Sequence, residues 1–156
     1  MNMKRIGLWV VGVGVLISSG LLVVEQGYAD ENNRVTKCTL ATLNGRYLFA
    51  LTGTLFPPAA GVTEESLEAR AGSRIFFGDG TGTTIATTSI NGVVTAKDTH
   101  SDLSYTVNAD CTGTLKVLSV GANMEIFIAP DGDDMTVIAT DNGHVEAYSS
   151  RRVGPK

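Results

Sequence analysis

The chain has 156 residues, 43% of them hydrophobic, and a formal net charge of −4 at pH 7. An acidic chain of this length fits a single small domain and argues against a partner with a phosphate backbone, so we expect no nucleic-acid ligand. The sequence contains no nucleophile elbow, no phosphate-binding loop and no zinc-protease helix motif, and it points to no cofactor.

The N-terminus has the pattern of a secretory signal. A short basic start is followed by an uncharged apolar run over residues 6–24, and Gly27 and Ala29 supply small residues for a cut after Ala29. The run is also just long enough to span a bilayer as an uncleaved membrane anchor, which needs about 20 apolar residues. We expect cleavage of residues 1–29, a secreted or periplasmic protein, and no membrane span afterwards.

Cleavage would change the working protein. It would leave a polar lead-in at residues 30–44 and a β domain at residues 45–156. It would also remove Trp9, the only Trp, and make the charge more negative, because Lys4 and Arg5 leave with only one acid, Glu25.

Two cysteines remain, Cys38 and Cys111. In an oxidising compartment an even pair predicts a disulfide, which would close a loop of about 70 residues and stabilise the fold by about 4 kcal/mol in the chain-entropy model. The alternative is two unpaired buried thiols. Neither cysteine has a Cys or His at ligand spacing, so we predict no metal site.

From residue 45 onward the pattern is that of β-structure. Alternating and β-branched runs are separated by turn signals, among them Asp79-Gly80 and Asn91-Gly92, which favour tight hairpins. Residues 57–68 are expected to form a loop, and residues 64–70 a helical turn. The sequence predicts eight or nine short strands, at residues 47–55, 71–77, 83–90, 93–98, 103–107, 114–119, 124–128, 135–140 and 145–151.

Such spacing fits a β-sandwich or a small barrel. The connections are tight, so consecutive strands should be neighbours, and a meander leaves two exposed edges unless it closes. We therefore predict an all-β fold, an eight-stranded antiparallel up-and-down β-barrel with a lipocalin-like shape, whose interior is filled by side chains or holds one small ligand.

Six aromatic or apolar residues are expected to face the lumen. In a filled barrel they form the core; in a hollow one they line an apolar pocket, with tyrosine hydroxyls and Arg46 or Arg74 as polar groups. These candidates are Tyr47, Phe49, Ile75, Phe77, Tyr105 and Phe127.

Few residues suggest chemistry directly. His100 and His144 are the only histidines, and each follows or precedes a turn, so exposed loop positions are expected for both. The acidic turn at residues 131–134 resembles a calcium loop, but Asn142 stands where an EF-hand needs Glu, which favours a solvated hairpin turn.

Four segments together resemble small secreted bacterial proteins of the allene oxide cyclase-like barrel family. They are LNGRYLF at 43–49, FGDGTG at 77–82, NGVV at 91–94 and YTVNADCTGT at 105–114. The resemblance implies an eight-stranded barrel and a lumenal apolar ligand, with no residue matching the cyclases' catalytic positions.

Three functions follow from these expectations. The first is an exported barrel that binds a small apolar molecule, or an envelope accessory protein, without catalysis. The second is an isomerase or cyclase that folds its substrate in the lumen. The third is a structural surface module with a filled core. The sequence sets neither the ligand nor the oligomeric state.

Overall fold

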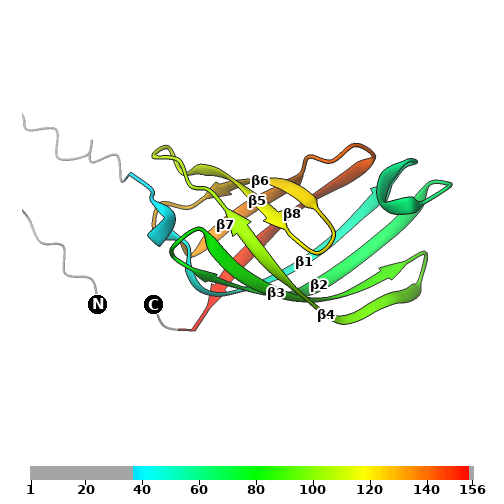
Figure 1. Cartoon of the computed structure of the whole chain (residues 1–156), viewed down its shortest axis with the longest axis horizontal. Coiled ribbons are helices and arrows are strands. Elements are labelled where there is room, and N and C mark those ends of the chain that lie inside the picture. Colours follow the sequence, from blue (N-terminus) through cyan, green and yellow to red (C-terminus); the bar gives the residue numbers. More distant parts are fainter. Residues whose placement is uncertain (1–36, 155–156) are drawn as a thin grey trace, which may run out of the picture. The chain divides into compact units, whose positions relative to one another are not determined.

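The computed structural model describes residues 37–154, so the expected signal peptide lies outside the described residues. Eight strands and two short 3-10 turns make up this part of the chain (Figure 1). Their bounds are η1 Leu40–Thr42, β1 Asn44–Leu55, η2 Ala59–Gly61, β2 Ser66–Phe77, β3 Thr81–Ile90, β4 Val93–Tyr105, β5 Thr112–Val117, β6 Ala122–Ile128, β7 Asp134–Ala139 and β8 His144–Val153.

The strands close into a barrel. Each strand pairs antiparallel with the next one along the chain, and β8 pairs back with β1, which confirms the predicted eight-stranded up-and-down barrel. The β3–β4 turn has the predicted chemistry: Asn91 and Gly92 have φ values of 49° and 81°, as a primed hairpin turn requires. Within residues 37–154, no helix is long and apolar enough to cross a membrane.

Two predicted strand boundaries are wrong. β2 begins at Ser66, so the segment expected as a loop or helical turn is extended and paired with β1. Its pattern is inverted: Leu67 faces solvent and is 65% exposed, whereas Glu68 is buried. β4 is one strand where two were expected, and it passes an irregularity near Thr88 of β3 and a positive φ of 48° at Asp98.

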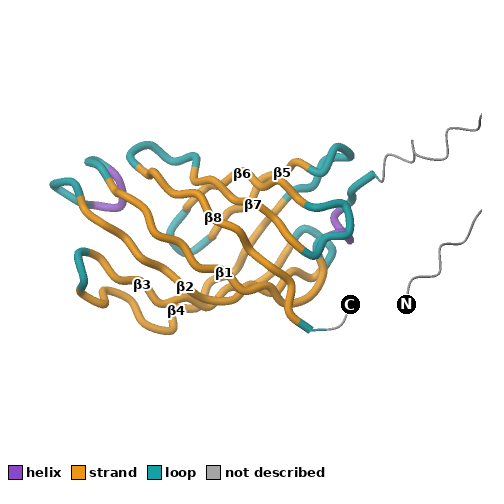
Figure 2. The backbone as a smooth tube through the Cα atoms, turned by 180° about the vertical axis from the view of Figure 1, so that it is seen from behind, coloured by secondary structure: helices purple, strands orange, loops and turns teal. Residues whose placement is uncertain are grey.

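Strand length differs around the barrel. β1 and β2 have 12 residues each and β4 has 13, whereas β5 and β7 have only 6. β4 pairs with β5 through only three residue pairs, from Leu103 to Tyr105, so its first ten residues continue without β5 beside them. Figure 2 shows β1–β4 extending beyond the short strands at one end of the barrel.

The other end is filled. The ring of Phe76 makes edge-on contacts with Tyr47 and Tyr105, at centroid separations of 5.2 and 5.0 Å. The Tyr105 hydroxyl donates to the carbonyls of Leu40 and Leu43, and the Tyr47 hydroxyl donates to that of Gly132. These bonds tie η1 and the β6–β7 turn over the end of the core.

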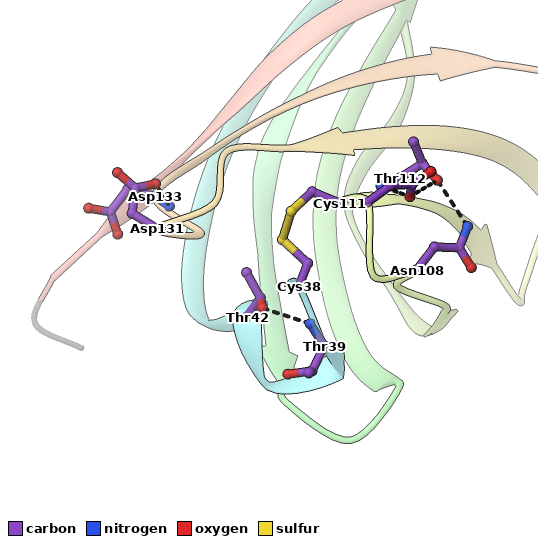
Figure 3. Close-up of a disulfide and its surroundings, with 9 residues drawn as sticks. Cys38, Thr39, Thr42, Asn108, Cys111, Thr112, Asp131 and Asp133 are labelled. Carbon is purple, nitrogen blue, oxygen red and sulfur yellow. Dashed lines mark hydrogen bonds between the residues drawn. A yellow bond between two sulfur atoms is a disulfide. The ribbon is translucent and has the colours of Figure 1, made fainter. Parts of the chain in front are cut away.

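The predicted disulfide is present. Cys38 and Cys111 are bridged, with Cα atoms 5.0 Å apart, and Cys38 also donates a backbone hydrogen bond to Ala109. Figure 3 shows the bridge joining the segment before η1 to the β4–β5 turn at the filled end. There it anchors the segment before η1 to the β4–β5 turn.

The acidic turn at residues 131–134 is part of this closure. Gly132 has a φ of 71°, and a Cβ there would lie 2.1 Å from the carbonyl oxygen of Thr42. Arg152 donates to the carbonyls of both Thr42 and Gly132 and forms an ion pair with Asp133. Figure 3 shows Asp131 and Asp133 on this turn, and the contacts of Arg152 give the turn a structural role.

Candidate ligand-binding site

The open half of the barrel contains a cavity of about 460 Å³. That volume lies within the range of small-molecule sites, roughly 300–1,000 Å³. Its wall is largely apolar, with three charged side chains, all from β2. The lining residues are Phe49, Leu55, Val62, Glu68, Arg70, Arg74, Thr84, Ala86, Thr88, Ile90, Thr95, Ala96, Thr99, Ser101, Val117, Ser119 and Val120.

Small residues lie where β2 and β3 meet near this space. Gly72 pairs with Phe49 on one side and with Ala86 on the other. A Cβ at Gly72 would lie 2.0 Å from the carbonyl oxygen of Ile85, so the backbones approach too closely for any side chain. On β3 the short side chains of Thr84 and Ala86 line the cavity.

Arg74 lies at the inner side of this cavity and is only 3% exposed. Its guanidinium carbon lies 4.2 Å from the centre of the Phe49 ring, and Nη2 donates to the Tyr148 hydroxyl at 2.6 Å. Nε and Nη1 are buried and have no hydrogen-bond partner, and no carboxylate within residues 37–154 forms an ion pair with Arg74. The folded chain therefore holds a buried cation with two unused donor atoms.

Two carboxyl groups meet nearer the mouth. Gly53 of β1 pairs with Glu68 of β2 on one side and with Glu146 of β8 on the other. A Cβ at Gly53 would lie 2.5 Å from Cγ of Glu146, so the missing side chain provides the room in which the two glutamates approach. Glu68 also forms an ion pair with Arg70, whose Nε donates to Thr88.

The environment of Glu68 disfavours its charged form. Burial is the largest cause, followed by the Glu146 carboxyl, while Arg70 acts in the opposite direction, and together they raise the pKa of Glu68 to about 7. Oε1 of Glu68 is paired with Arg70, and Oε2 has no hydrogen-bond partner within the described chain. Glu68 is thus a buried carboxyl group whose pKa lies close to neutral pH.

His144 joins the same group from β8. Its Nδ1 lies 3.0 Å from Oε1 of Glu146. The two residues are two positions apart on one strand, so their side chains share a face, and both are largely buried. Glu68, His144 and Glu146 each offer one nitrogen or oxygen atom within 4.8 Å of the others. The prediction of an exposed loop position is therefore wrong for His144, whereas His100 is exposed.

Half of the expected lumenal residues point outward. Ile75, Phe77 and Phe127 are 41, 51 and 49% exposed, so placing them in the lumen was wrong. The strand register explains the error: in β2 the inward position is Phe76, between two residues that were assigned to the inside.

Tyr47, Phe49 and Tyr105 are buried as expected, but only Phe49 lines the cavity. The hydroxyls of Tyr47 and Tyr105 are used in closing the filled end, so neither serves as a polar group for a ligand. Of the two arginines considered, Arg46 is exposed and Arg74 faces the cavity.

The sequence reasoning missed Glu68, Arg70 and Glu146. A signal was present in the alternation of Ser66, Glu68 and Arg70 with smaller or apolar residues, but charged residues at period two indicate an exposed face in most sheets. Comparisons with known proteins add no further assignment. No protein-family model matches this chain, and no curated protein is significantly similar to it.

Proposed function

We propose that this protein binds a small, largely apolar molecule carrying an acidic group in the open half of the barrel. The observation that carries the proposal is Arg74. A buried charge is strongly unfavourable unless it is paired, and Arg74 has no counter-ion within the described chain. A carboxylate or similar anion on the ligand would supply the missing charge and accept from Nε and Nη1.

The rest of the cavity suits the apolar part of such a ligand. Leu55, Val62, Ile90 and Val117 lie around the space between Arg74 and the mouth. Burying an alkyl chain against such a wall contributes about 25 cal/mol per Å² of apolar surface removed from water. Affinity would then come from the chain, and selectivity for acids from Arg74.

A matched pair of probes tests this proposal. We expect decanoate to bind the purified chain more tightly than decanol in calorimetry and in native mass spectrometry, because only the acid pairs with Arg74. Arg74→Met should remove that preference, with a loss of at least about tenfold in affinity for decanoate. Arg46→Met, an exposed arginine on neighbouring β1, should leave it unchanged.

Two results would contradict the proposal. One is equal affinity for the acid and the alcohol in the wild-type chain. The other is an acid preference that survives in a folded Arg74→Met variant. Far-ultraviolet circular dichroism and the unfolding midpoint would establish that the variant is folded.

A second candidate function is isomerisation or cyclisation of such a molecule. This function is favoured by Glu68, a buried acid that lines the same cavity as Arg74. Its carboxylate could take a proton from one atom of the substrate and return it to another. The test is incubation with apolar extracts of the host. A product of unchanged mass but altered retention, formed by the wild type and not by Glu68→Gln, would support catalysis; binding without conversion would leave the non-catalytic reading.

We also propose that the protein is exported and related to the allene oxide cyclase-like barrels. The closed barrel with one hollow half supports the relationship, and the disulfide supports an oxidising compartment. The cavity does not support the reading of a surface module with a filled core. The intact mass of the protein from the periplasm or medium of its host, with or without residues 1–29, tests export and cleavage.

A further inference from the structure

We propose that Glu68, His144 and Glu146 form a binding site for a divalent transition-metal ion of the zinc type at the mouth of the barrel. The inference does not depend on the proposed ligand, because Arg74 is not part of this group of residues. The three ligand atoms lie within 4.8 Å of one another. Zinc bonds of about 2.0–2.2 Å to nitrogen and oxygen require ligand separations of a little over 3 Å, so small side-chain adjustments bring all three to one ion.

The architecture around Gly53 argues for a built site. β1 carries no side chain at the one position that lies between Glu68 and Glu146, and a Cβ there would collide with Glu146. Without this gap the two carboxyls would be separated by a residue of the intervening strand. The fold thus brings like charges together in a buried place, an arrangement that a cation between them would stabilise.

Burial of the three side chains and the unpaired Oε2 of Glu68 also favour a metal site. The side chain of Glu68 is fully buried; its Oε1 is paired with Arg70, and its Oε2 has no hydrogen-bond partner within the described chain. Glu146 and His144 are also largely buried, and His144 is oriented by its contact with Glu146. Carboxylate oxygens beside an imidazole form the donor set that binds zinc in proteins.

The net charge of the ligands also fits. Two carboxylates and a neutral imidazole carry two negative charges, which a divalent ion neutralises. Three protein ligands leave a fourth position for water or for a bound molecule. Calcium is a poor fit because it needs six to eight oxygen ligands, and the described residues bring together two carboxylates and one imidazole here.

Arg70 would compete with a metal ion for the carboxylate of Glu68. It forms an ion pair with Glu68 and is partly exposed, so its guanidinium can remain on Thr88 when Glu68 turns to a metal. The alternative to a metal site is a closed ion-pair network of the same four side chains. The two readings make different predictions for a variant that lacks the Arg70 charge. A metal site would bind its ion more tightly in that variant, whereas an ion-pair network would still bind none.

Calorimetry with zinc chloride on the chelator-treated chain provides the test. We expect one zinc ion per chain, an increased unfolding temperature, and no binding of calcium. Glu68→Gln, Glu146→Gln and His144→Gln should each weaken zinc binding at least about tenfold, because each removes a ligand. His100→Gln, the exposed histidine, is the matched control and should have no effect.

Two further variants keep the test decisive if a ligand substitution fails to fold. Arg70→Gln should tighten zinc binding, and Gly53→Ala should weaken it by pushing Glu146 away. The neighbouring Thr52→Ala, on the outward face, should have no effect. The proposal is overturned if the wild-type chain takes up no stoichiometric zinc, or if zinc affinity is unchanged in folded His144→Gln. A metal bound through Glu68 would also remove that group as a proton donor, which would count against the isomerase.

Discussion

Glu68 holds its proton more tightly in the folded chain than in the unfolded one. Burial is the main reason and the Glu146 carboxyl the next; the pKa rises from 4.5 to about 7. Between these values the folded state keeps a proton that the unfolded state has lost, so this group stabilises the fold fully below pH 4.5 and ceases to do so above about pH 7.

The resulting prediction concerns Glu68→Gln in the presence of a chelator. The neutral side chain should raise the free energy of unfolding at pH 8 by about 1–3 kcal/mol relative to wild type, and the difference should shrink towards pH 4.5. Urea titrations at several pH values measure it.

Exposed Glu125→Gln serves as the control and should give no such trend. Comparing each variant with wild type is necessary because Asp79, Asp110 and Asp141 have pKa values lowered by hydrogen bonds, and their contributions have the opposite sign. A difference between Glu68→Gln and wild type that does not vary with pH would contradict the assignment.

At the scale of an element, β2 determines the site and was also the hardest strand to predict. The apolar residues of its second half predicted a strand, and the turn signal at Asp79-Gly80 predicted correctly where that strand ends. Its first half was missed because Leu67 faces water and Glu68 faces the lumen, the reverse of the usual pattern. Hydrophobic periodicity identifies filled interiors, and it fails where a binding cavity places charges inside.

The consecutive residues Phe76 and Phe77 test the register of β2. Phe76 is 1% exposed and packs between two tyrosines, whereas Phe77 is 51% exposed. We expect Phe76→Ala to lower the free energy of unfolding by about 3–5 kcal/mol, and Phe77→Ala by about 0.5 kcal/mol or less. Urea denaturation of both variants measures the contrast, and similar losses at the two positions would show that the register is wrong.

The whole molecule divides into a filled end and a hollow end. The barrel itself could be predicted, because eight alternating runs joined by tight turns have few other solutions. The division into a filled and a hollow end could not be predicted from the sequence. It depends on strand lengths and on close backbone approaches, such as that of Gly72 to Ile85, which arise only when the barrel closes.

The disulfide belongs to the filled end, and its removal should affect stability alone. Cys38→Ser with Cys111→Ser opens a loop spanning 73 residues. We expect a loss of about 2–4 kcal/mol in the free energy of unfolding. Binding of decanoate at 25 °C should be unchanged, because neither cysteine lines the cavity. A variant that keeps its stability but loses affinity would contradict this separation.

The short pairing of β4 with β5 has a mechanical consequence. Seven of the eight strand junctions have longer ladders; this one has three residue pairs between Leu103 and Tyr105, with three further backbone hydrogen bonds just outside the ladder. This is the shortest ladder of the barrel and it lies beside the cavity wall, so we expect it to open before the other strand junctions do. If the lumen binds a ligand as proposed, opening at this junction would admit a wider molecule while the filled end of the barrel stays intact.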